Sequence, residues 1–294
     1  MEGSLRSALE HHLRELTREP RTPKSESHAH ARRYVRSSLE QSGFTVDERR
    51  FDGPGFTGFN IFTRPIPARG GLPLFIVGAH YDSVTDSPGA DDNASGVAAL
   101  LALAAIIGSW PNPEKWTCRL QLAAYDLEEY GILGSWIHAQ AFKQAGEHVC
   151  GMISLEMLGY TDHRPGSQRL PPHLVGVYPD TGNFIGLCGN EASREFVQFV
   201  ESGMRSIAGI PVESLLVPGA GEAIAEVRLS DHSSFWDAGY PALMITDTSF
   251  FRNPHYHRAT DTVETLDLGF LEKVTKGVCN AVNGILMGPA AHGA

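Results

Sequence analysis

Residues 77–104 read VGAHYDSVTDSPGADDNASGVAALLALA, and this stretch decides the fold class. It begins in a continuous apolar run, residues 74–79, of the kind found in a strand that is covered on both faces. It ends in a helical run of small apolar residues, 96–107. The loop between them is crowded, because one His, four Asp and three Gly fall within residues 78–97. A buried strand, a polar loop and a buried helix in this order predict an α/β protein.

The same pattern returns three times along the chain. Apolar runs at residues 120–125, 150–155 and 242–246 each lead into an acidic or His-bearing loop. Ligand sites of open α/β sheets lie outside the carboxyl ends of the strands, so we expect these loops to converge on one crevice. Helical spacing is found at residues 5–16, 29–43, 135–144, 193–207 and 270–286.

Length and composition fit one large globular domain. The chain has 294 residues, of which 42% are hydrophobic and 20% are charged, as in ordinary globular proteins. We therefore treat residues 1–294 as a single domain. The segment 160–229 follows the alternation of strands and helices less well than the rest. We expect it to be an insertion that covers the site like a lid.

The charge balance and the amino-terminal segment restrict the partners. The chain carries 34 acidic side chains against 24 Lys and Arg, and no basic tract that would bind nucleic acid or anionic lipid. Residues 1–20 are charged and amphipathic, unlike a secretory leader, and no apolar run approaches the ~20 residues of a membrane helix. We expect a cytoplasmic protein without nucleic-acid or membrane partners. The cysteines lack CxxC spacing and are expected to be buried thiols: Cys118, Cys150, Cys188 and Cys279.

The crowded loop holds two pairs of chemically informative residues. His80 and Asp82 are two positions apart, so on an extended chain they point the same way, and the carboxylate can hold the second ring nitrogen of the imidazole. A simple hydrogen bond between them is the plainer interpretation. Asp91 and Asp92 stand in a turn that opens a helix, where one Asp would be enough for an N-cap.

Later loops add further carboxylates and imidazoles. Glu128 and Glu129 are adjacent beside apolar residues, so they repel each other unless a cation or a shared proton separates their roles, although a solvated helix start is the alternative. Glu156 ends a buried run, where a lone carboxylate needs a partner. His255 and His257 are again two positions apart, with Asp261 near them.

The absence of several well-known motifs excludes some classes of active site. The sequence contains no metal-binding Cys cluster, no GxSxG nucleophile elbow and no phosphate-binding P-loop. A ligand set of carboxylates and imidazoles suits zinc with hydrolytic chemistry, and two metal ions about 3.5–4 Å apart can share one bridging carboxylate.

Taken together, the motifs resemble the co-catalytic di-zinc aminopeptidases, whose relatives include glutamate carboxypeptidases and glutaminyl cyclases. The resemblance covers residues 74–268 and rests on the order HYDS, GADDNASG, DLEEYGILGS, SLEMLGY, and SDHSSF with NPHYHRATDT. It implies a three-layer α/β/α fold around a mostly parallel mixed sheet. It also implies a metallopeptidase that removes N-terminal residues from peptides with two zinc ions per chain.

The resemblance also assigns roles to single residues. Glu128 would be the general base, Tyr256 a donor to the oxyanion, and Asp82 the residue that orients His80. A cis peptide bond is expected after the bridging Asp. Asp231 and His232 would support the site or contact the substrate. The implied metal ligands are His80, Asp92 as the bridge, Glu129, Glu156 (where many relatives have Asp) and His257.

Three alternatives stay open at this stage. A glutaminyl cyclase would be a single-zinc acyltransferase on the same fold, and a non-catalytic relative would be expected to lack the base or a ligand. A carboxypeptidase for acidic C-termini would need an arginine cluster, whereas these arginines are scattered in the sequence: Arg164, Arg169, Arg228 and Arg252. For an aminopeptidase, the pocket for the N-terminal side chain is expected to use Phe184, Ile185 and Leu187. No role is assigned to Asp86 or Asp91.

Overall fold

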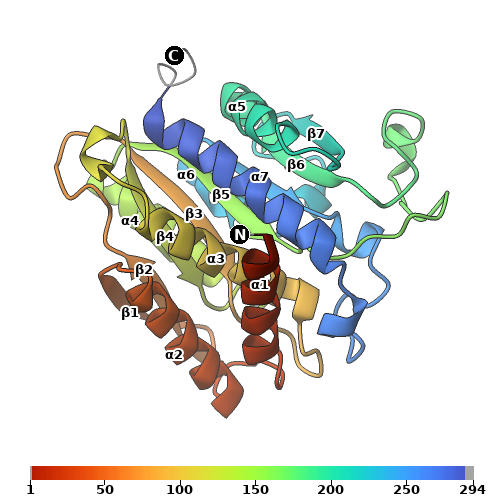
Figure 1. Cartoon of the computed structure of the whole chain (residues 1–294), viewed down its shortest axis with the longest axis horizontal. Helices are drawn as coiled ribbons and strands as arrows, with labels where there is room; N and C mark the ends of the chain where they lie inside the picture. Colours follow the sequence, from red (N-terminus) through yellow and green to blue (C-terminus); the bar gives the residue numbers. More distant parts are fainter. Residues whose placement is uncertain (1, 289–294) are drawn as a thin grey trace.

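The computed structural model describes residues 2–288, which form a central sheet with helices on both faces (Figure 1). The eight strands lie in the order β1-β2-β4-β3-β5-β8-β6-β7. They are β1 (Val46–Gly53), β2 (Phe56–Thr63), β3 (Leu74–His80), β4 (Arg119–Tyr125), β5 (Val149–Glu156), β6 (Ile185–Asn190), β7 (Val212–Val217) and β8 (Ala242–Thr246). The helices are α1 (Glu2–Leu16), α2 (Glu26–Gln41), α3 (Gly96–Gly108), α4 (Leu133–Ala145), α5 (Arg194–Arg205), α6 (His232–Ala238) and α7 (Leu268–Met287).

The sheet is parallel at its centre and antiparallel toward its sides. Strands β4, β3, β5 and β8 run parallel to one another, as the continuous apolar runs predict. On one side, β2 pairs antiparallel with both β1 and β4. On the other side, β6 is antiparallel to β8 and parallel to β7. The predicted mostly parallel mixed sheet is confirmed.

Helices bury both faces of the sheet and give three layers. Side chains of α1, α2, α3, α5 and α7 form one hydrophobic core with strand residues such as Val77 and Ile153. Residues of α4 and α6 form a second core with Ile76 and Met152, which are one position away in the same strands. This alternation follows from the two-residue repeat of a strand. The three-layer α/β/α architecture is therefore confirmed.

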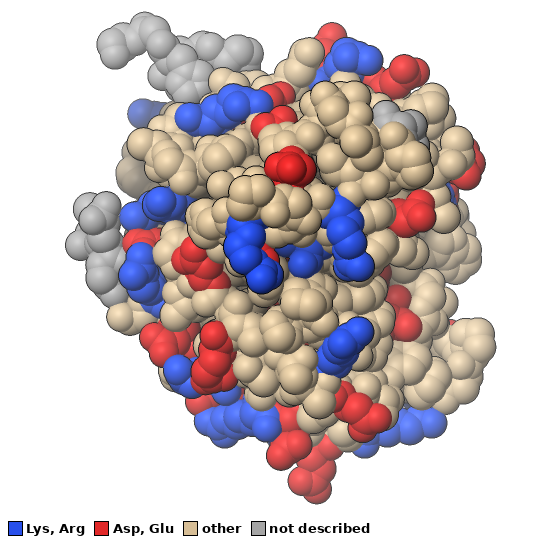
Figure 2. Space-filling view, turned by 90° about the vertical axis from the view of Figure 1, so that its right-hand side faces the viewer, with Lys and Arg blue, Asp and Glu red and all other residues tan. Residues whose placement is uncertain are grey.

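The helix behind the crowded loop lies in the centre of the fold. The stretch Ala90–Gly108 is the one stretch among the described residues that is long and apolar enough to cross a membrane, but 89% of it is buried inside the protein. Its Ala-rich sequence lets it pack closely against β3, β4 and β5. On the face shown in Figure 2, acidic and basic side chains are interspersed, and neither sign forms a continuous surface.

The structure differs from the expected insertion at residues 160–229. Strands β6 and β7 and helix α5 all lie within this segment and belong to the sheet and its helical layer. The parts of the segment outside these three elements are 160–184, 191–193, 206–211 and 218–229, of which the first and last contribute to a cavity described below. Strand β6 contains two glycines, and β7 is half-exposed along most of its length. Neither strand therefore has the continuous apolar run that revealed the central strands.

Candidate metal centre

The predicted ligands come from separate elements and meet at the carboxyl end of the central strands. His80 is the last residue of β3, and Glu156 is the last residue of β5. Glu129 follows β4, and Asp92 lies in the turn that leads into α3. His257 comes from the loop after β8. Parallel neighbouring strands end at the same edge of the sheet, which is why residues far apart in the sequence come together here.

Asp92 lies between the two imidazoles. Its Oδ1 is 3.4 Å from Nε2 of His80, and its Oδ2 is 3.1 Å from Nε2 of His257. Glu156 Oε2 lies 3.4 Å from the same nitrogen of His80, and Glu129 Oε2 lies 3.1 Å from that of His257. The five side chains form two groups of three that share Asp92, with the ligand atoms of each group within 4.8 Å of one another.

The donor set fits a cation because buried negative charge exceeds what the imidazoles balance. Burial raises the pKa of Asp92, but His257 and His80 outweigh burial and hold that pKa well below its usual range. Burial lowers the pKa of His257, whereas its contacts with Asp92 and Glu129 raise it to about 10. Glu129 keeps one buried oxygen, Oε1, without a hydrogen-bond partner among the described residues. A metal cation would satisfy that oxygen and the surplus charge.

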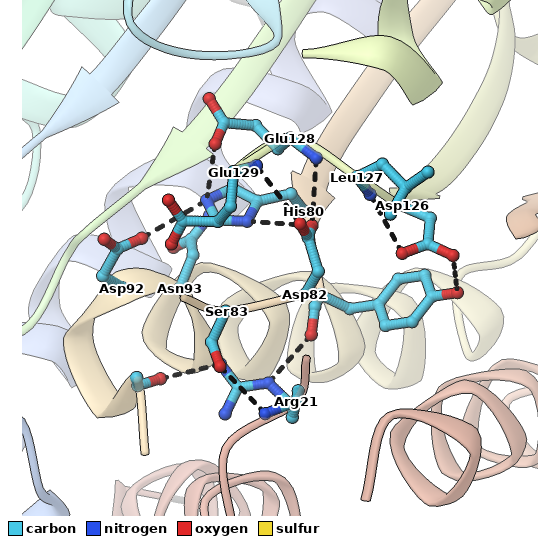
Figure 3. A network of polar contacts seen from close by, with 12 residues as sticks. Arg21, His80, Asp82, Ser83, Asp92, Asn93, Asp126, Leu127, Glu128 and Glu129 are labelled. Atoms are coloured by element: carbon cyan, nitrogen blue, oxygen red, sulfur yellow. Dashed lines mark hydrogen bonds and ion pairs between the residues drawn. The ribbon is translucent and has the colours of Figure 1, made fainter. Parts of the chain in front are cut away.

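Asp82 connects two of the strand ends (Figure 3). Its Oδ1 lies 3.4 Å from Nδ1 of His80, on the ring side opposite Asp92. The same carboxylate accepts the backbone N–H groups of Glu128 and Glu129, each at 3.1 Å. One buried side chain therefore faces the imidazole, which it is predicted to orient, and fixes the backbone of the adjacent carboxylates.

Arg21 holds the loop between His80 and Asp92 from below, and the sequence analysis missed it. The fully buried guanidinium donates hydrogen bonds to the carbonyl of Tyr81 at one end of the loop and to the carbonyl of Gly89 at the other, both at 2.8 Å. Gly89 has a φ of 60°, and a Cβ there would lie 2.2 Å from the carbonyl oxygen of Asp92. A lone Arg in the stretch EPRTP carries no sequence pattern that would reveal this contact.

Further carboxylates and a hydroxyl anchor the remaining ligands. Asp261 accepts the backbone N–H groups of Asp91 and Asp92, at 2.9 and 3.2 Å, although sequence reasoning gave it no role. Ser230 Oγ donates to Glu156 at 2.8 Å. Asp126, just before the pair of glutamates, accepts the N–H of Leu127 and a hydrogen bond from His28. These three residues could not be recognised from the sequence, because each makes hydrogen bonds to backbone groups or to buried side chains that are distant in the sequence or carry no motif.

Glu128 and Tyr256 line the cavity next to the ligand groups, where the sequence predicts them. Glu128 Oε2 is 3.9 Å from Nε2 of His80, and burial raises the pKa of this carboxyl group well above its usual value. The ring of Tyr256 stacks on His257 with the ring centres 3.8 Å apart. The peptide bond between Asp92 and Asn93 is cis, as the resemblance implies. The catalytic roles of Glu128 and Tyr256 stay predictions.

The structure accounts for other acidic residues without placing them in the cavity. Asp91 is buried and accepts hydrogen bonds from the N–H of Gly159 and the side chain of Asn253, whereas Asp86 is exposed. Asp231 and His232 are fully buried and are not among the residues that line the cavity. Burial raises the pKa of Asp231 to about 7. This placement disfavours substrate contact by either residue, and their supporting role stays a prediction.

A cavity of about 430 Å³ extends from the ligand groups along the sheet toward β7. Phe184 and Leu187 border it, as expected, although the side chain of Leu187 packs together with Ile185 in the core on the other face of β6, and Ile185 does not border the cavity. The expectation for Ile185 is wrong because neighbouring residues of a strand point to opposite faces. Of the four arginines considered, Arg169 alone is among the lining residues.

Comparison with known proteins identifies the family. Residues 67–282 match the family described as "Peptidase family M28", and the chain belongs to this family. It is 38% identical over 259 residues to the protein YfbL of Escherichia coli, covering 83% of this chain and 76% of that protein. It is 32% identical to a probable leucine aminopeptidase of Arthroderma benhamiae, covering 65% of this chain. The match spans 48% of that fungal protein, about half its length.

Solved structures share the fold. The zinc aminopeptidase BSAP of Bacillus subtilis superposes with a TM-score of 0.75 at 15% identity, covering 97% of this chain and 96% of that one. The glutaminyl cyclase of Porphyromonas gingivalis superposes with a TM-score of 0.72 at 17% identity, covering 96% of this chain and 98% of that one. The same architecture therefore occurs in a zinc aminopeptidase and in a glutaminyl cyclase.

Proposed function

We propose that this M28-family chain is an aminopeptidase that removes N-terminal residues from peptides and holds two zinc ions. The observation that carries the proposal is Asp92, whose two carboxylate oxygens face two different imidazoles, each backed by its own glutamate. A carboxylate in this position suits a bridge between two metal ions. One group would hold the first ion through His80 and Glu156, and the other would hold the second ion through Glu129 and His257.

In the proposed reaction, Glu128 moves the proton. Zinc bound at this centre would polarise the scissile carbonyl and lower the pKa of an attacking water. Glu128 borders the cavity with one oxygen facing His80. It would take the proton of the water and return it to the leaving amine, and its raised pKa suits both steps. Tyr256, beside His257, would donate a hydrogen bond to the oxyanion.

Two features favour this function over the alternatives. A glutaminyl cyclase with a single zinc would not need two complete ligand groups, whereas this site offers both. A carboxypeptidase for acidic C-termini would need several arginines at the pocket. Arg164 is exposed and paired with Asp162, and Arg228 is paired with Asp237.

A metal count combined with an activity panel tests the proposal. We expect about two zinc ions per chain and release of p-nitroaniline from aminoacyl p-nitroanilides. Treatment with phenanthroline should abolish this activity, while circular dichroism shows that the fold is kept, because the ligands stand at the ends of strands in a packed sheet. One zinc ion per chain, together with cyclisation of N-terminal glutamine and no amide hydrolysis, would instead favour the cyclase.

A further inference from the structure

The floor of the cavity is built from two rows of residues that run across the sheet. Residues that pair directly in neighbouring strands point to the same face. In the first row, Glu156 of β5 pairs with Thr246 of β8, Thr246 pairs with Gly186 of β6, and Gly186 pairs with Glu213 of β7. All four residues line the cavity. The row therefore begins at a predicted metal ligand and ends at a second carboxylate.

The middle of this row leaves room for a substrate. Gly186 has no side chain, and Thr246 is small. A long side chain that starts beside Glu156 therefore meets no bulky residue on this row before Glu213. The remaining walls of the cavity come from the loops around β6 and β7, including Leu174, Tyr178 and Leu229.

The second row supplies an apolar track beside the first. It consists of Met244, Cys188 and Leu215, which pair with one another across β8, β6 and β7 and also line the cavity. Each of them lies two positions away from a member of the first row, so both rows share one face. A methylene chain on this track would keep apolar contact along its length.

The span from Glu156 to Glu213 sets the length of the side chain that can connect them. Neighbouring strands lie about 4.8 Å apart, so the two residues, three strands apart, are separated by roughly 14 Å. An extended lysine side chain spans roughly 6 Å, given bonds of about 1.5 Å, and a hydrogen-bonded ammonium adds about 3 Å. The substrate carbonyl at the metal centre takes up the remaining distance. A leucine side chain has three bonds from Cα to its tip instead of five and carries no ammonium group, so it stops short of Glu213.

The far carboxylate is available for a cationic group. Glu213 is half-buried and forms no ion pair with the described basic side chains. Tyr178 lies next to it: the hydroxyl of Tyr178 donates to the carbonyl of Ser214 at 2.8 Å, and burial, followed by the charge of Glu213, raises the pKa of this tyrosine. Arg169, a basic residue that also lines the cavity, is bound to the carbonyl of Phe250 in the loop after β8.

We infer that the cavity selects peptides whose N-terminal residue has a long aliphatic stem ending in a cation, lysine or arginine, and that Glu213 is the residue that recognises the cation. The inference rests on the proposed aminopeptidase function. The stem lies along Met244, Cys188 and Leu215, and the charged head pairs with Glu213. The metal centre is then the reaction end of the cavity, and β7 carries its specificity end.

The test compares p-nitroanilides of lysine and norleucine, which share a four-carbon stem and differ in the ammonium group. For the unmodified protein we expect kcat/KM for lysine to exceed that for norleucine by about two- to fivefold, as a half-exposed ion pair allows. In Glu213→Gln the ratio should fall to about one. The matched control is Glu191→Gln, which removes an exposed carboxylate beyond the other end of β6 and should keep the ratio.

A second series, of substrates with shorter stems, needs no protein variant and therefore tests the inference even if Glu213→Gln does not fold. Ornithine and diaminobutyrate shorten the stem by one and two methylenes, so their advantage over neutral amino acids of equal stem length should shrink stepwise. A lysine-to-norleucine ratio of one or less in the unmodified protein would overturn the inference while leaving the aminopeptidase intact. A ratio that Glu213→Gln does not change would overturn the role of Glu213. Absence of any amide hydrolysis would instead contradict the proposed function.

Discussion

The two ends of the cavity are built in different ways. At the metal end, each predicted ligand stands at a strand end or in the loop beside it, and buried groups such as Asp82, Arg21 and Asp261 fix its backbone or its ring. At the β7 end, Glu213 and Gly186 belong to the regular sheet, and loops form the remaining walls. The chemistry therefore depends on short contiguous motifs held by many hydrogen bonds, whereas the proposed selectivity depends on strand register.

The first way to sharpen this contrast is to remove the proposed base without touching the ligands. Glu128→Gln should lower kcat by about 10³-fold, since general base catalysis contributes about 10²- to 10⁴-fold, while zinc content stays unchanged. Steady-state kinetics and metal analysis check both expectations. The neighbouring variant Glu129→Gln is the comparison, because it should lose zinc as well as activity. A Glu128→Gln protein with normal turnover would remove this residue as the base.

A second test concerns the support beneath the metal end. Arg21→Met should lower the free energy of unfolding by about 3 kcal/mol or more, because buried carbonyl groups such as those of Tyr81 and Gly89 lose their donor. Denaturant titration measures the change. Arg14→Met, on the exposed side of α1, removes a surface guanidinium and should change the free energy of unfolding far less. Equal stability of the two variants would contradict the support assigned to Arg21.

A third test asks whether the two ligand groups are distinct. His257→Ala should weaken the binding of one zinc ion by about 100-fold or more and leave the other in place, since loss of a direct ligand exceeds the 10- to 100-fold cost of losing a supporting group. Titration with a competing chelator resolves the two affinities. His255→Ala is the control, because His255 contacts Thr260 and belongs to neither group. Unchanged zinc binding in His257→Ala would exclude this residue as a ligand.

A fourth and smaller effect concerns the pH dependence of the free energy of unfolding and involves neither end of the cavity. Burial lowers the pKa of His138, on α4, to about 3, whereas in the unfolded chain it is about 6.5. The unfolded state therefore binds the extra proton below pH 6.5, and stability falls as the pH drops from there toward 3. The loss should be roughly 2 kcal/mol between pH 7 and pH 5.

Unfolding curves at several pH values check the contribution of His138. His138→Leu should flatten the pH dependence between pH 7 and pH 5, although it also loses the contact between the ring and the hydroxyl of Tyr125. His148→Leu, which removes an exposed histidine just before β5, serves as the matched control. The same slope in His138→Leu and in the unmodified protein would show that another group is responsible.

The contrast between the two ends also explains how far the sequence could predict the structure. The central strands β3, β4, β5 and β8 are buried on both faces, so each is a continuous apolar run that can be recognised without neighbours. Strand β2 was not predicted, since it begins with two half-exposed residues and has a glycine as its third residue. Strands β6 and β7 were assigned to an insertion because their hydrophobic pattern is interrupted.

The same reasoning applies to single residues of the site. His80, Asp92 and Glu156 could be predicted because their type and their position at a strand end are both visible in the sequence. Arg21 could not be predicted, because it acts on carbonyl groups of a loop some 60 residues away, with no partner side chain to match. Ile185 was predicted to line the cavity, but it lies one position away from a cavity-facing residue of β6. A shift of one position in a strand turns the side chain from the cavity to the core on the opposite face.

The contact of Arg21 with the loop bears on where this domain begins. The family match starts at residue 67, yet the guanidinium that ties the two ends of the loop is supplied from residue 21, just after α1, the helix near the label N in Figure 1. A fragment cut at the family boundary would keep every predicted ligand and lose the clamp beneath them. The unit that must fold is therefore longer than the family match, and we expect trimming of the first twenty-five residues to loosen the metal centre although it removes none of the predicted ligands.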